Sequence, residues 1–181
     1  ARTFQLNAAF ESLTVIENTL VGSYFGHSNR IFPGPRFSKG SVERAEWALE
    51  LVGMIGEMDK SVDTLPVYKR KLLMMAGALA AKPSILMMDE PVGGLNAQEI
   101  NDIMEIVRKV NQAGVTILLI EHVMRFLVAL SDRVIIMHRG QNIYEGLPDG
   151  LASDKMVVDV YLGEGASELM SDALERAPDH V

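Results

Sequence analysis

The chain contains no cysteine and no long apolar run, and each absence excludes a class of protein. Without cysteine there is no disulfide framework, no thiolate metal site and no cysteine nucleophile. No apolar stretch reaches the roughly 18 residues that a membrane-spanning helix needs. Excess positive charge is lacking too, because 17 basic residues face 24 acidic ones and the net charge is −7. An acidic chain without a basic block is a poor nucleic-acid binder, so we expect no nucleic-acid partner.

The composition is that of an ordinary globular domain. The 181 residues are 48% hydrophobic and 23% charged, and one domain commonly takes about 100–200 residues. The first residues, ARTFQLNAAFE, have neither the apolar region of a signal peptide nor an initiator methionine. We therefore expect a fragment or a processed product.

The N-terminal part of the sequence predicts helices. Thr14 followed by Glu17 forms a capping-box pattern at the start of a helix over 14–26. A second helix is expected over 41–58, capped by Ser41, with an apolar face made by Ala45, Ala48, Leu49, Val52 and Ile55. A third is expected over 67–81. The segment 27–40 is rich in Pro, Gly and basic residues and is predicted to be a loop.

After residue 82 the pattern becomes alternating strands and helices. Strands are predicted at 84–88, 115–120, 133–137 and 142–145, helices at 96–112 and 123–130, and two short helices near 147–153 and 155–161. The first of these strands has no polar alternation, which is typical of a strand buried on both faces. The strand–helix–strand–helix–strand order predicts an α/β layer with parallel strands.

Two adjacent carboxylates, Asp89 and Glu90, end the first strand and are followed by Pro91. Side chains at the carboxyl end of a parallel strand project into the crevice where α/β folds bind ligands. There Asp89 would suit Mg²⁺, which takes one or two carboxylates together with phosphates, and Glu90 would suit a water-activating base. The alternative is that the carboxylates cap a helix.

Two further polar residues are candidates for the same site. His122 follows the next strand, at the same sheet end as Asp89, where it would bond a phosphate or a water; the alternative is a capping or merely satisfied histidine. Gln5 carries an amide that reaches both metal and water, but alone it is a weak signal.

Together these motifs resemble the ATP-binding-cassette (ABC) ATPases. ILMMDEPVGGLN is similar to the Walker B segment and D-loop of that family, and TILLIEHVMRF to its switch-histidine strand. ARTFQL, LTVIENTLVG and VVDVYLGEG resemble the ATPase subunits of branched-chain amino acid importers. The resemblance covers roughly residues 1–163 and implies a partial P-loop NTPase fold, with a parallel sheet, flanking helices and a helical subdomain.

The resemblance also implies residue roles. Asp89 would hold Mg²⁺, and the Gln5 amide would contact both the metal and the attacking water. Glu90 would be the general base, and His122 would contact the γ-phosphate. Phosphoryl transfer depends mostly on positioning and charge stabilisation, so each role needs the others. The remaining implied nucleotide-binding positions are Pro66, Val67, Tyr68, Lys69, Gly94, Leu95 and Asn96, of which the last three would cross to a second subunit.

The sequence departs from the family at two places. It contains no G-x-x-x-x-G-K-[ST] motif, which cradles phosphates. The signature stretch falls on residues 65–69, LPVYK, where Pro66 lacks an N–H and Tyr68 adds bulk in place of glycine. The basic residues 69–71 would still attract phosphate or would form a solvated basic turn. In the family the P-loop segment carries the strand beside the Walker B strand, so the resemblance also leads us to expect an exposed apolar edge and low solubility, or a partner chain.

These observations predict four regions and two competing functions. The regions are a Q-loop end (1–6), a helical subdomain (7–82), a RecA-like catalytic half (83–163) and an acidic tail (164–181). The leading hypothesis is the ATP-binding, cytoplasmic and membrane-peripheral subunit of an ABC importer for branched-chain or similar amino acids, truncated or degenerate, with ATP and Mg²⁺ as cofactors. Its partners would be a transmembrane permease, docked near 31–37, and a second ATPase subunit. The alternative for 31–37 is a mobile surface loop whose Phe residues fold back onto the core of the helical subdomain. The alternative is a non-catalytic pseudo-ATPase that pairs with an intact subunit; an unrelated α/β protein is a distant third.

Overall fold

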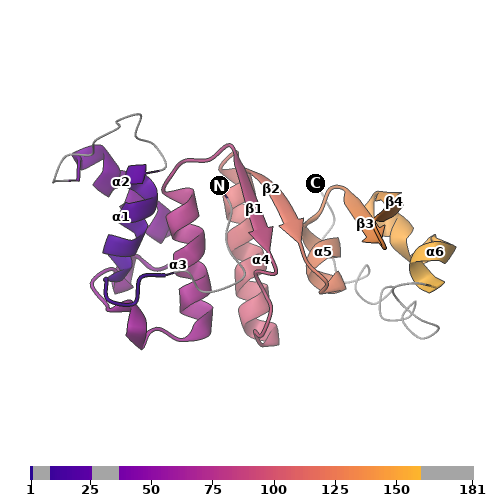
Figure 1. Cartoon of the computed structure of the whole chain (residues 1–181), viewed down its shortest axis with the longest axis horizontal. Helices are drawn as coiled ribbons and strands as arrows, with labels where there is room; N and C mark the ends of the chain where they lie inside the picture. The colour runs from indigo at the N-terminus through magenta and orange to yellow at the C-terminus, as the bar shows by residue number, and fades with distance from the viewer. Residues whose placement is uncertain (2–8, 26–36, 160–181) are drawn as a thin grey trace. The chain divides into compact units, whose positions relative to one another are not determined.

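The structure is a computed structural model that describes residue 1, residues 9–25 and residues 37–159 (Figure 1). Backbone contacts divide the chain into two compact units, Ala1–Ile120 and Glu121–Val181, and each is described by itself. This division follows packing, so the functional division into four regions remains a prediction. Gln5, most of the predicted docking loop and the acidic tail lie outside the described residues.

Three α-helices pack together at the start of the first unit: α1 (Val15–Phe25), α2 (Lys39–Leu51) and α3 (Val67–Leu79), with 3₁₀ turns at Ile55–Glu57 and Val62–Thr64 (Figure 1). The capping box predicted for α1 is confirmed. The Thr14 N–H donates to Glu17 Oε2 at 2.8 Å, and the Glu17 N–H donates to Thr14 Oγ1 at 3.3 Å.

Both predicted ends of α2 are wrong. Ser38, not Ser41, is the N-cap, and its hydroxyl accepts a hydrogen bond from the Ser41 N–H. The helix ends at Leu51 because Gly53 takes a φ of 74° and closes a Schellman motif, in which the next N–H, of Met54, donates to Leu49 O at 2.7 Å. Ile55 therefore leaves the predicted apolar face and is 40% exposed.

Helices α1 and α3 meet at backbone contact distance. A Cβ built on Gly22 would lie 2.0 Å from the carbonyl oxygen of Gly77, whereas a Cβ on Gly77 would meet nothing within 4 Å. Glycine at position 22 is thus what permits this approach. The core around the three helices is made of small and medium apolar side chains, among them Val15, Ala45, Ala48, Leu49, Leu72, Ala76 and Leu79.

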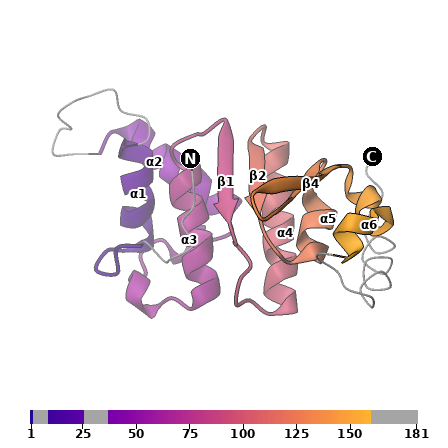
Figure 2. The same ribbon diagram turned by 45° about the vertical axis from the view of Figure 1, so that its right-hand side comes forward.

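A two-stranded parallel sheet follows in the same unit. β1 (Ile85–Asp89) pairs with β2 (Thr116–Ile120) in a register running from Ile85↔Thr116 to Asp89↔Ile120 (Figure 2). Helix α4 (Ala97–Gln112) connects them. Asn96 and Glu99 form a full capping box at its start, so the predicted start of this helix at Asn96 is confirmed. The predicted parallel α/β layer with flanking helices is confirmed.

The prediction that the first strand is buried on both faces is wrong. Leu86 and Met88 are buried, but Ile85 and Met87 on the other face are 50% and 37% exposed. Leu118 and Ile120 of β2 share that face and are also half exposed. A parallel strand is buried on both sides only when both sides are covered, and these exposed fractions show that the second face is only partly covered within the described residues.

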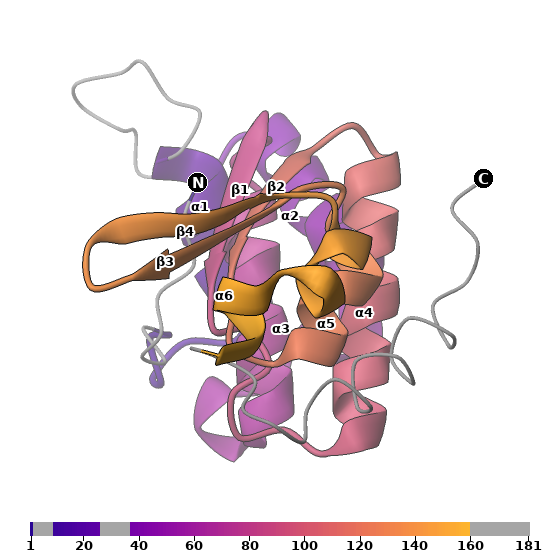
Figure 3. The same cartoon turned by 90° about the vertical axis from the view of Figure 1, so that its right-hand side faces the viewer.

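The second unit contains α5 (Met124–Leu130), β3 (Val134–His138), β4 (Gln141–Gly146), a 3₁₀ helix (Pro148–Ser153) and α6 (Lys155–Val157). Within this unit β3 pairs antiparallel with β4 (Figure 3), and the expectation that β3 also joins the parallel layer stays a prediction. The hairpin turn is Arg139-Gly140, with φ of 46° and 79°, as a two-residue type I′ turn requires. The core of this unit is Val128, Val134, Ile136, Leu151 and Val157.

Candidate nucleotide site

Asp89 and Glu90 lie where the sequence predicts, at the carboxyl end of β1. Asp89 is the last residue of the strand and pairs with Ile120. Glu90 then turns the chain with a φ of 45°, in the left-handed region that non-glycine residues seldom adopt. The Glu90 N–H donates to Ile120 O at 2.9 Å, so the turn is anchored to the end of the neighbouring strand. The helix-cap alternative for both carboxylates is wrong, since α4 begins at residue 97 and Asn96 is its cap.

The predicted D-loop residues form the turn between Glu90 and α4. Gly94 takes a φ of 76°, and the Leu95 N–H donates to Val92 O at 3.2 Å. The side-chain oxygen of Asn96 accepts from two N–H groups of the first turn of α4, those of Gln98 and Glu99, both at 3.0 Å. Asn96 thus has a structural role in starting the helix, and its predicted contact with a second subunit stays a prediction.

The signature-like segment, residues 65–69, lies at the start of α3. Pro66 occupies the N-cap position with extended backbone and makes no side-chain cap, and Val67 is 52% exposed. Tyr68 is partly buried, and this burial raises the pKa of its phenol, helped by the carboxylates of Asp102 and Glu99 on α4. The side chains of Pro66 and Val67 have no hydrogen-bond donor for a phosphate, and of these three residues only Tyr68 carries one, its phenol O–H.

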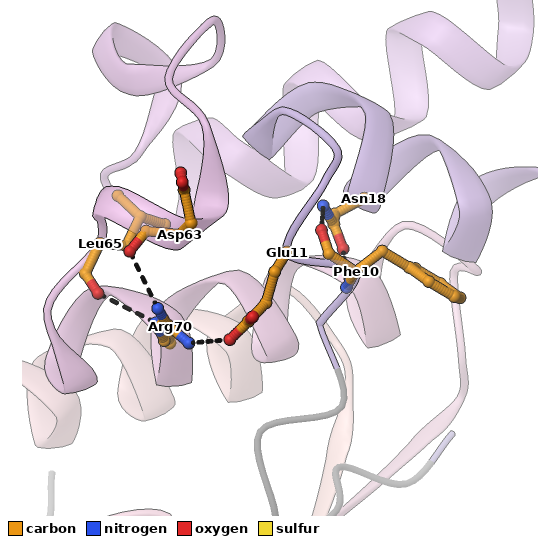
Figure 4. A network of polar contacts seen from close by, with 6 residues as sticks. All are labelled: Phe10, Glu11, Asn18, Asp63, Leu65 and Arg70. Atoms are coloured by element: carbon orange, nitrogen blue, oxygen red, sulfur yellow. Dashed lines mark hydrogen bonds and ion pairs between the residues drawn. The ribbon is translucent and has the colours of Figure 1, made fainter.

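The basic residues that follow are used inside the helical part of the first unit. Lys69 Nζ lies 3.0 Å from Glu57 Oε1, and this hydrogen bond is the main cause that lowers the pKa of the Glu57 carboxyl. Arg70 donates to Glu11 Oε1 at 2.8 Å and to the carbonyl oxygens of Leu65 and Asp63 at 3.0 Å each (Figure 4). The interpretation of residues 69–71 as a solvated basic turn is therefore wrong.

Lys71 points toward the strand end. Its Nζ donates to the carbonyl oxygen of Glu90 at 3.3 Å across 19 residues of sequence. Sequence reasoning missed this contact, because nothing local in the sequence links a lysine on α3 with a residue after β1.

His122 lies in the second unit, between β2 and α5, and is largely exposed. Its N–H donates to Glu121 Oε2 at 3.0 Å, and its ring Nδ1 lies 3.7 Å from the same oxygen. The Glu121 side chain is fully buried and also accepts from the Val123 N–H. Val123, not His122, occupies the N-cap position of α5, so the capping alternative for the histidine is wrong. Glu121 was missed by sequence reasoning; its only signal is its place beside the histidine.

The described residues contain no group of three or more potential metal ligands, and Gln5 lies outside them. Mg²⁺ rarely uses an all-protein cage and takes most of its ligands from phosphates and water. A single half-buried carboxylate at a strand end, Asp89, fits that requirement. In the described ranges no helix has the length and apolar character to cross a bilayer.

Comparisons with known proteins agree with this architecture, although no family model matches the chain. The chain is 33% identical to the high-affinity branched-chain amino acid transport ATP-binding protein BraF of Pseudomonas aeruginosa, over 90% of its own length and 67% of that protein. The LivG protein of Escherichia coli K12, of the same description, gives the same values. The chain belongs to the family of ABC transporter ATP-binding proteins. It spans about two thirds of the length of these relatives.

Solved structures of ABC ATPases have the same fold. The ADP conformation of MJ1267, an ATP-binding cassette of an ABC transporter, superposes with a TM-score of 0.76 at 30% identity, covering 91% of this chain and 68% of that one. A nucleotide-free ATP-binding cassette gives 0.75 at 28% identity. The predicted partial P-loop NTPase fold is confirmed.

Proposed function

We propose that this chain is the ATP-binding subunit, or part of it, of an ABC importer for branched-chain or similar amino acids. The observation that carries the proposal is the strand end: Asp89 closes a parallel strand, Glu90 turns away from it, and a glycine-containing turn leads into a capped helix. Carboxyl ends of parallel strands are where α/β folds bind ligands. The likeness to BraF and LivG supports the transported class.

Each candidate residue has a chemical role in this proposal. Bound Mg²⁺ would be held by Asp89, with Gln5 as a second group, and would neutralise phosphate charge. Glu90 would accept a proton from the attacking water, which requires its carboxylate form at neutral pH. His122 would donate a hydrogen bond to the terminal phosphate.

A second candidate function is favoured by the signature-like segment. Pro66 has no N–H to offer a phosphate, Tyr68 places a partly buried ring where backbone would approach, and Lys69 is paired with Glu57. These features suit a non-catalytic pseudo-ATPase that pairs with an intact ABC subunit and contributes little turnover. In both cases the partners would be a second ATPase subunit and a transmembrane permease, with the chain at the cytoplasmic face of the membrane.

The predicted docking loop has one described residue, Phe37. Its ring packs edge-to-face on Tyr24 of α1 with centroids 5.6 Å apart, and its side chain is still about half exposed. For Phe37, this contact supports the alternative that the Phe residues of the loop fold back onto the helical part, and docking of a permease near 31–37 stays a proposal.

Titration with labelled Mg·ATP tests the proposal. We expect negligible binding by this chain alone, because several charge-assisted phosphate contacts of about 1.5–3 kcal/mol each have no donor in this sequence. We expect binding when the chain is mixed with an intact ABC ATPase subunit, beyond what that subunit binds alone. Micromolar binding by the chain alone would contradict the first expectation. If the mixture binds ATP without hydrolysing more of it, the pseudo-ATPase is the correct function.

A further inference from the structure

The backbone at Glu90 is held in an unfavourable conformation. Its φ of 45° brings the Cβ close to backbone atoms, so only glycine adopts it freely. Such a residue persists when its surroundings fix it, and it is often found at functional sites. The question is which contacts fix this one.

At least three hydrogen bonds hold the Glu90 peptide groups. The N–H donates to Ile120 O at 2.9 Å, and the carbonyl oxygen accepts from the Gly93 N–H at 3.3 Å. Both are local to the strand end. The third partner, Lys71 Nζ, also donates to the carbonyl oxygen at 3.3 Å, and it comes from a different element, α3. At 3.3 Å this bond is long, but the ammonium donor adds a charge–dipole attraction that the neutral N–H donors lack.

The position of Lys71 on α3 links the conformation of Glu90 to the position of this helix. Lys71 lies four residues after Val67, one turn into α3, and the adjacent Leu72 and Leu73 are buried in the core. The helix is therefore firmly packed where the lysine leaves it. A shift of the start of α3, which carries the signature-like segment, would move the ammonium group relative to Glu90.

We propose that Lys71 is a positioning residue that holds Glu90 in its left-handed conformation and so couples the start of α3 to the direction of the Glu90 carboxylate. That Lys71 fixes the backbone of Glu90 does not depend on nucleotide binding. That this affects the activation of water by Glu90 rests on the proposed function. Neighbouring Lys69 provides a matched control, because its ammonium group is paired with Glu57 instead.

The test is nuclear magnetic resonance of the whole chain in three variants. In Lys71→Met we expect the Cα and Cβ shifts of Glu90 to leave their left-handed values and its amide to exchange about tenfold faster, since hydrogen bonds from charged groups contribute on this scale. Lys71→Arg keeps a charged donor and should restore both signals. Lys69→Met should leave the Glu90 signals unchanged. Unaltered Glu90 shifts and exchange in Lys71→Met would overturn the proposal.

A second measurement covers the case in which Lys71→Met fails to fold. Glycine at position 90 takes a positive φ without support, so the effect of Lys71→Met on the unfolding midpoint should shrink in a Glu90→Gly background. An equal effect in both backgrounds, or a double variant that also fails to fold, would show that Lys71 acts elsewhere. Because neither measurement uses ATP, failed Mg·ATP binding would leave this inference standing, and its own failure would leave the proposed function untouched.

Discussion

The contact between α1 and α3 makes a quantitative prediction for Gly22→Ala. The added Cβ would lie 2.0 Å from the Gly77 carbonyl oxygen, 2.8 Å from its carbonyl carbon and 3.2 Å from its Cα. All three are backbone atoms, so no side chain can rotate away. The two helices would have to move apart by about 1 Å or more to reach ordinary contact distances.

Two opposing effects set the size of the change. Overpacking of this kind costs typically about 1–3 kcal/mol, while replacing a helical glycine by alanine gains about 0.5–1 kcal/mol. Because the obstacle is rigid backbone, we take the upper part of the first range and expect a net loss of roughly 2 kcal/mol. For a chain of this size that lowers the Tm by about 4–8 °C.

Gly77→Ala is the matched control. It makes the same chemical change on the facing helix, but its Cβ would meet nothing within 4 Å. We expect it to stabilise the chain by up to about 1 kcal/mol. Unfolding of this unit can be followed in urea by the fluorescence of Trp47, the single tryptophan, which lies on α2. If Gly22→Ala is neutral or stabilises as Gly77→Ala does, the close approach of α1 and α3 is wrong.

Three further predictions concern the cap, the pH dependence and the site. Asn96→Ala removes the acceptor of two N–H groups and should cost about 1 kcal/mol of unfolding free energy, measured by urea denaturation; Asn96→Asp should retain most of it. Lys69 lowers the pKa of Glu57 in the folded chain, so its stabilising effect is complete above the unfolded pKa and lost as pH falls through the folded one; the stability gap between wild type and Lys69→Met should close below about pH 4, and a constant gap would contradict the pairing. In a site completed by an intact subunit, Glu90→Gln should retain ATP while turnover falls about 10²–10⁴-fold, and unchanged turnover would show that Glu90 is no base.

The sequence predicts best those elements whose signals are local. The helix after Asn96 has its capping box within four residues, and the capping box of Thr14 and Glu17 at the start of α1 is equally local. Gly53 is a local signal for the end of α2, whereas the apolar periodicity continues to Ile55 and so predicts a helix that is too long.

The contacts that organise the candidate site are beyond any local pattern. Arg70 reaches Glu11 across 59 residues, and Lys71 reaches Glu90 across 19. Runs of basic residues are ordinarily solvated, and only the fold reveals that these two point in different directions. The exposed face of β1 is a similar case, because strand composition reports how apolar a strand is and not whether a second layer covers it.

The two halves of the candidate site therefore need different experiments. Glu90 is set by contacts made within this chain, from Ile120, Gly93 and Lys71, so its geometry is expected to exist before any nucleotide binds. Phosphate binding, in contrast, finds no donor at Pro66, and Lys69 is engaged with Glu57. Affinity for ATP must then come from groups outside these segments. The conformation of Glu90, in contrast, is expected to need no such groups. A measurement that reports only turnover would confuse the two, and the Glu90 resonances separate them.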